Sequence, residues 1–312
     1  MIRRFGISAA VFITTGAVLA QAPPPGIAAG GPQPLWTVST DFASPESAYF
    51  DSASGALFVS NINGQVLEKD GNGYISRLTP EGKVVAMKWA AGLNAPKGMR
   101  SSGGTLWVTD IDEVVAIDIA SGRVTSKVKV EGASFLNDLA TAPDGTVYAS
   151  DSNNSTIYAV KNGTSSVFVS GADIVEVPNG VLVDGGRLIL GTIGPATAGG
   201  RGGARAGRGG GPAAPAGRLY AFDLRTKNRT VITAQPIGGI DGIEPDGRGG
   251  FLVTDVVGSR LLHVTAAGVS TTVLTFTAGG ADFGYSPASR LAVIPFLAGS
   301  VVSAWDLTSL VK

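Results

Sequence analysis

Acidic and amide side chains recur along this chain at positions that could share one metal ion. Glu46, Asn137, Asn179, Asp241 and Asp282 each open a repeated unit of the sequence. Carboxylates mixed with neutral amide oxygens, without His or Cys, are the ligands that hard cations prefer. Carboxylates gathered in one place would also repel one another unless a cation lay among them. We therefore expect one divalent metal ion, with calcium as the first choice and magnesium, manganese or zinc as alternatives.

A purely structural interpretation of these residues must be weighed against the metal site. Asn and Asp commonly form turns at strand starts, because their side chains bond to the nearby backbone. That interpretation fits Asp144, Asp184 and Asp246, which lie in PDG or DGG turns. It fits Asn137, Asn179 and Asp241 less well, because each lies about ten residues ahead of the next expected strand.

Three other residues have chemistry of their own. Lys97 opens the second unit and could neutralise a carboxylate or bind an anionic group on the axis, although a surface lysine with its charge in solvent is the favoured interpretation. Glu244 is expected in a loop or an ion pair. His263, the single histidine, lies in an expected outer strand and is interpreted as a half-buried structural residue.

The composition excludes several kinds of chemistry. The 312 residues contain no Cys, which excludes thiol catalysis, thiolate metal sites and disulfides. Lys and Arg together equal Asp and Glu at 24 each, so no nucleic-acid partner is expected. Hydrophobic residues make up 44% of the chain, enough to form a sizeable core. The sequence carries no signal for an oligomeric state.

The first residues resemble an export signal. Arg3 and Arg4 precede the apolar run Ile7–Ala20, and small residues lie before Gln21. We expect residues 1–20 to be a signal peptide cleaved near Ala20, which places the protein in the periplasm or outside the cell. An uncleaved anchor is the alternative, but the run is too short for a stable membrane span. Residues 21–34, rich in Pro, Ala and Gly, are expected to be a flexible leader.

The elements that must position these side chains are short strands. No long segment has a helical period, and β-type runs alternate with Gly, Pro, Asn and Asp, so the chain is predicted to be all-β. The expected strands include Ala56–Ser60, Thr105–Thr109, Val114–Asp118, Thr146–Ser150, Thr156–Val160, Arg187–Gly191, Leu219–Phe222, Phe251–Thr254, Leu261–Val264 and Leu291–Pro295.

The spacing of the units predicts a β-propeller. From Glu46 through Lys97, Asn137, Asn179 and Asp241 to Asp282, the intervals are 51, 40, 42, 62 and 41 residues. Three of them match the length of about 40–45 residues for a four-stranded blade. We therefore predict one six-bladed propeller over residues 35–312, closed by an N-terminal strand around Leu35–Val38, with residues 194–217 as a Gly- and Arg-rich inserted loop. Two domains divided at this loop are the competing interpretation.

These residues also carry a family resemblance. Pro45-Glu46 with Tyr49-Phe50-Asp51, Leu136-Asn137-Asp138, Pro178-Asn179-Gly180 and Ile240-Asp241-Gly242 occur in order at blade spacing. Over about Ser44–Trp305 the chain resembles the gluconolactonase and senescence marker protein (regucalcin) family, six-bladed propellers with one axial divalent metal. The resemblance implies that Glu46, Asn179 and Asp241 are metal ligands, that Asn137 lies beside the metal against substrate or water, and that Asp241 is the general base.

Two functions from different classes follow. The first is an exported, metal-dependent hydrolase that opens a small-molecule lactone or related ester. The alternative is a non-catalytic periplasmic propeller that binds a ligand or a protein and keeps a structural ion, because propellers host many unrelated functions.

Overall fold

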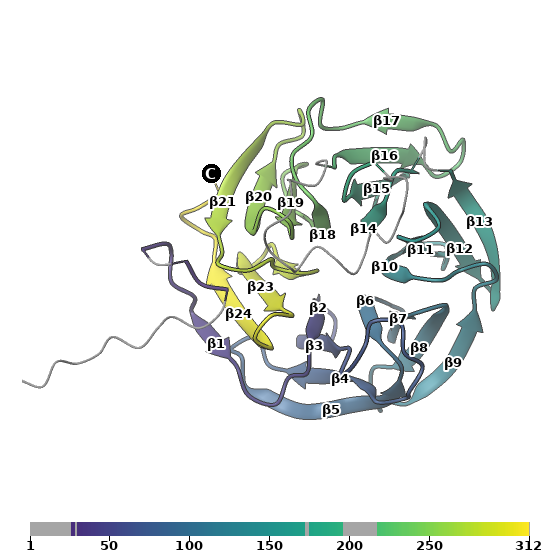
Figure 1. Ribbon diagram of the computed structural model, residues 1–312, viewed down its shortest axis with the longest axis horizontal. Helices are drawn as coiled ribbons and strands as arrows, with labels where there is room; N and C mark the ends of the chain where they lie inside the picture. Colours follow the sequence, from purple (N-terminus) through teal and green to yellow (C-terminus); the bar gives the residue numbers. More distant parts are fainter. Residues whose placement is uncertain (1–25, 29, 172–174, 196–216, 312) are drawn as a thin grey trace, which may run out of the picture.

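Six small sheets surround a central axis in the computed structural model (Figure 1), which describes residues 26–28, 30–171, 175–195 and 217–311. Each sheet has four antiparallel strands. The innermost strands contact one another in sequence order, and the first also contacts the last, so the ring is closed. The chain is therefore all-β and has the six-bladed propeller architecture that the repeat spacing predicts. Within the described ranges, no helix is long and apolar enough to cross a membrane.

The strands of the first three blades run in order from the axis to the rim. Blade one comprises β2 (Pro45–Asp51), β3 (Ala56–Asn61), β4 (Gly73–Leu78) and β5 (Val84–Leu93). Blade two comprises β6 (Pro96–Ser102), β7 (Thr105–Asp110), β8 (Glu113–Asp118) and β9 (Val124–Lys129). Blade three comprises β10 (Leu136–Thr141), β11 (Val147–Asp151), β12 (Thr156–Lys161) and β13 (Thr164–Ser170).

The last three blades follow the same order, except that the sixth combines both ends of the chain. Blade four comprises β14 (Pro178–Asp184), β15 (Arg187–Thr192), β16 (Leu219–Asp223) and β17 (Arg229–Val231). Blade five comprises β18 (Ile240–Pro245), β19 (Phe251–Asp255), β20 (Arg260–Val264) and β21 (Ser270–Thr275). Blade six comprises β22 (Gly284–Ser286), β23 (Leu291–Phe296), β24 (Val301–Asp306) and, outermost, β1 (Trp36–Val38).

The core lies between neighbouring blades and is apolar. One cluster includes Phe58, Leu93, Met99 and Leu106 and joins blades one and two. Another joins blades five and six around Phe276, Phe296 and Trp305, whose rings contact one another. Burial of this surface stabilises each blade against the next, because a single four-stranded sheet cannot cover both of its own faces.

The inner strands differ from the others at the end where they begin. In β2, β6, β10, β14 and β18 the pairing register with the neighbouring strand shifts at this end, so that each strand has a bulge. In blades two to five, two residues of the inner strand oppose one residue of its partner. A bulge interrupts the alternation of side chains and re-aims them, and bulges are common next to functional sites. These bulges contain five of the six residues that open the repeated units, all except Asp282.

Hydroxyl groups at three junctions bond to the entry of the inner strand of the next blade. Thr109 Oγ1 donates to the carbonyl of Asn137 at 2.5 Å, Ser150 Oγ to that of Asn179 at 2.6 Å, and Thr254 Oγ1 to that of Ala281 at 3.0 Å. Each donor lies opposite a bulge in the second strand of its own blade. The same device thus fixes the backbone of successive blades around the axis.

An Asp follows these hydroxyl residues and fixes the loop that enters the inner strand. Asp110 accepts hydrogen bonds from the backbone of Asn94 and Ala95 at 2.9 and 2.8 Å. Asp151 and Asp255 accept in the same way from their own entry loops. A buried carboxylate with backbone N–H partners orders a loop that has few apolar contacts. The strand-terminal Asp of the repeat is therefore a structural residue.

Candidate functional site

The six residues that open the repeated units lie at one end of the central channel. Glu46, Lys97, Asn137, Asn179 and Asp241 are in the bulges of β2, β6, β10, β14 and β18, whose labels surround the centre of Figure 1. Asp282 lies just before β22 and forms a bridge with Ser47 of blade one. All six residues are buried, with 7% or less of their surface exposed. The sequence did not identify these inner strands. The strands that it indicated begin about ten residues after Asn137, Asn179 and Asp241.

Small residues allow the inner strands to approach one another here. A Cβ atom at Gly98 would overlap the carboxylate of Asp138, and a Cβ at Gly180 would overlap the backbone carbonyl of Asp241. Each glycine follows a candidate residue directly in its bulge. The candidate side chains are thus brought together because the residues beside them have no side chain.

Four oxygen atoms of this group have no hydrogen-bond partner in the described part of the chain. They are Glu46 Oε2, Asn179 Oδ1, Asp241 Oδ1 and Asp282 Oδ1. Buried polar atoms are almost always paired in folded proteins, and leaving one unpaired costs about 1–3 kcal/mol. Four such oxygens at one end of a channel therefore call for a partner that the described residues do not supply.

The electrostatics of the site also favour an added positive charge. Burial, and then the neighbouring carboxylate of Asp241, raise the pKa of Glu46 well above its ordinary value. Burial, and then Asp282, raise the pKa of Asp241 to about 8. Each of these carboxyl groups is thus disfavoured in its ionised form by the others. A cation among them would remove that penalty.

This donor set fits a hard divalent cation. Glu46 and Asp241 offer carboxylate oxygens and Asn179 offers a neutral amide oxygen, all unpaired. No three His, Cys, Asp or Glu side chains in the described ranges come together as a metal-binding group of their own. The set therefore depends on the amide of Asn179, and mixed carboxylate and amide ligation is typical of calcium.

Asn137 and its neighbour Asp138 have different environments. The Asn137 amide nitrogen is 3.2 Å from Ser152 Oγ, and its side chain belongs to the same end of the channel. Asp138, which sequence reasoning missed as a buried group, accepts hydrogen bonds from the backbone of Leu139 and Val181 at 2.7 and 2.8 Å. Both carboxylate oxygens of Asp138 are thus engaged by the backbone, so this residue joins blades three and four.

Lys97 is not a surface lysine, and that expectation was wrong. Its residue is 1% exposed, and Nζ donates to the carbonyls of Ala95 and Val66 at 2.9 and 3.2 Å. The ammonium group also lies 4.9 Å from the ring centre of Phe135. Burial lowers the pKa of Lys97 to about 8, although Glu46 acts in the opposite direction. The bulge of β6 turns this side chain inward, which the residue type alone does not indicate.

Arg100 is a functional candidate that sequence reasoning missed. Its guanidinium is buried in the channel, 3.3 Å from Glu244 Oε1 and 3.8 Å from Asp282 Oδ2. Glu244 is therefore in an ion pair, one of the two environments expected for it. A lone Arg in a strand gives no sequence signal, because Arg more often keeps its charge in solvent. Arg100 lies near Asp282 Oδ2, and the other carboxylate oxygen of Asp282 is one of the four unpaired oxygens.

The remaining expected residues are structural. Asp246 accepts from the backbone of Arg248 and Gly250 in its turn, at 2.7 and 2.9 Å, and lies 2.8 Å from His263 Nε2. Burial alone would raise the pKa of Asp246, but these hydrogen bonds outweigh it and lower the pKa. His263 is in β20, away from the inner strands. The turn assignments of Asp144 and Asp246 and the structural assignment of His263 are confirmed.

Several expectations fall on parts of the chain outside the described residues. The signal peptide over residues 1–20 and most of the inserted loop over residues 194–217 are among them. Of the leader over residues 21–34, residues 21–25 and 29 also lie outside the described ranges, whereas Ile27 is buried in the apolar cluster of blades five and six. The loop leaves β15 at Thr192, which pairs with Pro178, and the chain resumes at Gly217 before β16. Its two described ends are thus on the face that holds Asn179.

Comparisons with solved structures identify proteins of the same architecture. A gluconolactonase from Xanthomonas campestris, described as important in glucose secondary metabolic pathways, aligns with a TM-score of 0.61 and 16% identity over 91% of this chain and 95% of that one. A candidate gluconolactonase aligns with a TM-score of 0.59 and 15% identity over 89% and 93%. A catalytically inactive variant of virginiamycin B lyase from Staphylococcus aureus, solved with quinupristin, aligns with a TM-score of 0.55 and 12% identity over 87% and 98%.

The amino-acid sequence of this chain matches no known family. No protein-family model matches the chain, and no curated protein matches it significantly. Identities of 12 to 16% extend over nearly the whole of both chains in each structural match. The structural neighbours of this chain therefore include gluconolactonases, and it has the six-bladed propeller fold that they share.

Proposed function

We propose that this protein is a metal-dependent hydrolase that opens a lactone or a related ester. The observation that carries the proposal is the group of four unpaired buried oxygens of Glu46, Asn179, Asp241 and Asp282 at one end of the channel. The two gluconolactonases with the same fold support lactones as the substrate class. The proposal includes export, because the sequence begins with an apolar segment of signal-peptide type.

Glu46, Asn179 and Asp241 would hold the ion, and the Asp282 carboxylate, which is paired with Ser47 and Arg100, would add negative charge nearby without being one of the ligands. A bound divalent cation supplies Lewis acidity toward a carbonyl oxygen and stabilises the negative charge that develops on it. Calcium is the proposed ion, because the donors are carboxylate and amide oxygens.

Asp241 would act as the general base. Its carboxylate would accept a proton from water as the water oxygen forms a bond to the carbonyl carbon of the lactone. The ring C–O bond then breaks, and the leaving oxygen takes the proton back from Asp241, which yields the free hydroxy acid. Burial raises the pKa of Asp241 to about 8 in the metal-free site, and a bound cation would lower it again, so that the carboxylate would be ionised and able to accept the proton.

Asn137 would position the substrate or the attacking water. Its amide is neutral and is held by Ser152, and its backbone carbonyl is fixed by Thr109. A group held on both sides keeps its orientation when substrate binds, which is the condition for productive alignment. Asn137 is therefore proposed as a substrate contact rather than as a principal metal ligand.

The test is acid release from a panel of sugar and aliphatic lactones in a pH-stat, with calcium, magnesium, manganese or zinc and after chelation. We expect turnover that stops on chelation and in Asp241→Asn and Asn179→Ala. Asp184→Asn is the control, because this carboxylate is exposed and pairs with Arg187. If no lactone is turned over with any metal although an ion is tightly bound, the non-catalytic binding propeller with a structural ion is correct.

A further inference from the structure

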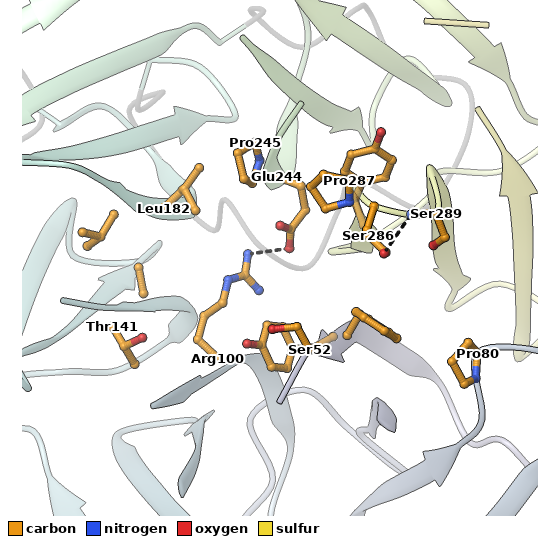
Figure 2. A pocket seen from close by; sticks show the side chains of 16 residues that line it. Ser52, Pro80, Arg100, Thr141, Leu182, Glu244, Pro245, Ser286, Pro287 and Ser289 are labelled. Atoms are coloured by element: carbon orange, nitrogen blue, oxygen red, sulfur yellow. Dashed lines mark hydrogen bonds and ion pairs between the residues drawn. The ribbon is translucent and has the colours of Figure 1, made fainter. Parts of the chain in front are cut away.

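A cavity lies at the end of the channel opposite the unpaired oxygens. It has a volume of about 690 Å³ and is lined by the ends of the inner strands and the turns that follow them (Figure 2). Arg100 and Glu244 are the charged residues among its lining residues, and Figure 2 shows their side chains directed toward each other. A volume of several hundred Å³ is typical of small-molecule sites in proteins.

The guanidinium of Arg100 is held by backbone carbonyls and by carboxylates. Nη1 donates to the carbonyl of Met99 at 2.7 Å and lies 3.8 Å from Asp282, and Nη2 donates to the carbonyl of Ile243 at 3.3 Å. Glu244, Asp138 and Asp282, in that order, act as counter-charges for this guanidinium. Arg100 therefore has a structural reason to be buried, since it compensates carboxylates near the candidate metal site.

Glu244 is the strongest counter-charge of Arg100, but Asp138 and Asp282 already provide two others. It adds a further carboxylate to a channel that already contains Asp138 and Asp282, and it is 8% exposed. Burial raises the pKa of Glu244 to about 7 although Arg100 opposes the shift. A buried charge pair is weak evidence for stability, because desolvation offsets most of its attraction. A carboxylate kept at the floor of a cavity under these conditions is better explained by a ligand that it binds.

The walls and rim indicate the kind of ligand. Tyr49, Tyr285, Leu182, Pro245 and Pro287 present apolar surface. Hydroxyl groups are provided by Ser52, Thr141, Ser286 and Ser289. The floor is internally neutralised by the pair of Arg100 and Glu244, so a charged ligand is not required. The Glu244 carboxylate can only accept hydrogen bonds, whereas the surrounding hydroxyls can donate and accept them. Ligand hydroxyl groups, which also donate and accept, match this set.

We propose that this cavity is a second small-molecule site for a neutral polyhydroxyl compound such as a monosaccharide. Ligand hydroxyls would donate to Glu244 and exchange hydrogen bonds with Thr141 and Ser286. The C–H faces of the sugar would lie against the apolar walls that include Tyr285. The cavity is at the other end of the channel from the proposed hydrolase reaction, and Arg100 lies between the two sites.

Calorimetric titration of the full-length protein with methyl α-D-glucopyranoside tests the proposal, because this sugar is neutral and is not a lactone. We expect a dissociation constant of about 1 mM, weakened about tenfold in Glu244→Gln. Leu182→Trp, which fills the cavity from β14, should abolish binding, whereas Val231→Trp on the exposed outer strand β17 should not. Asn179→Ala, at the other end of the channel, should leave the affinity within twofold of the unchanged protein.

The outcomes separate the alternatives. Loss of sugar binding in Asn179→Ala with full binding in Leu182→Trp would place the sugar at the candidate metal site and overturn the proposal. If the protein binds N-methylacetamide more tightly than the sugar, and Leu182→Trp abolishes that binding, the polyhydroxyl assignment is overturned. Absence of any sugar binding up to its solubility would overturn the site itself. If Glu244→Gln does not fold, Leu182→Trp and its control decide the question alone.

Discussion

Asp282 accepts a hydrogen bond from the hydroxyl of Ser47 at 2.5 Å, across the junction between the last blade and the first. The backbone of Ala48 donates to the carbonyl of Asp282 at 3.1 Å in the same place. The other carboxylate oxygen of Asp282 is one of the four without a partner. One residue therefore takes part both in ring closure and in the candidate metal site.

Ser47→Ala should destabilise the protein by about 1–3 kcal/mol, because it leaves Asp282 Oδ2 buried without its hydroxyl donor. Chemical denaturation of the metal-free protein measures this change. Ser126→Ala, at an exposed position on the outer strand β9, is the matched control and should have little effect. Equal stabilities for the two variants would show that the contact between blades one and six does not depend on this hydroxyl.

Asp241→Asn should lower turnover of the best lactone by at least about a thousandfold, since it removes both a proposed metal ligand and the proposed base.

Asn137→Ala should lower kcat/KM by about tenfold to a hundredfold while the metal affinity changes by less than about threefold. Steady-state kinetics and calorimetric metal titration of both variants provide the two measurements. Loss of metal binding in Asn137→Ala would make this residue a ligand and not a substrate contact.

The sequence predicted the middle of each blade better than its edges. All ten strands expected from β-type runs are second or third strands of their blades, such as β11 and β12. These strands are buried on both faces and are therefore rich in Val, Ile, Leu and aromatic residues. The outer strands, such as β9, are largely exposed and have a polar composition that resembles a loop.

The inner strands were missed for a different reason, and this limited the site prediction. A segment such as Pro178–Asp184 begins with Pro-Asn-Gly, which is typical of a turn. In the structure it is a bulged strand whose Asn lies beside Asp241 of the next blade. Repeat spacing alone identified the aligned residues. Arg100 and Asp138 have no such periodic signal, because their burial depends on contacts between blades.

The metal-free protein should lose stability as pH rises from about 4 to about 8. Burial and neighbouring carboxylates raise the pKa of Glu46 and Asp241 above their unfolded values of 4.5 and 3.8, the latter to about 8. In this window the folded state binds more protons than the unfolded state, so each rise in pH favours unfolding. The stabilisation by calcium should grow over the same range, because the metal replaces these protons.

Denaturation curves with and without chelator across this pH range test that expectation. Calorimetry in buffers of different ionisation enthalpy should also show protons released when calcium binds, and fewer of them as pH rises toward 8. The variant that combines Glu46→Gln with Asp241→Asn is the control, and its metal-free stability should depend less on pH. A metal-free protein that becomes more stable between about pH 5 and about pH 8 would contradict the assignment of these carboxyls as a cation site.

Lys97→Met should increase calcium affinity by about tenfold, equivalent to about 1.4 kcal/mol, when measured at about pH 7, where the Lys97 ammonium is still protonated. The buried ammonium lies in the same ring of residues as the proposed ligand Glu46, and its positive charge opposes that of a bound cation. Methionine keeps most of the side-chain volume, although it cannot donate to the carbonyls of Val66 and Ala95. Calorimetric titration measures the change, with Lys127→Met on the exposed strand β9 as the control. Weaker calcium binding in Lys97→Met alone would show instead that the ammonium is needed to keep the ligand carboxylate ionised and in place.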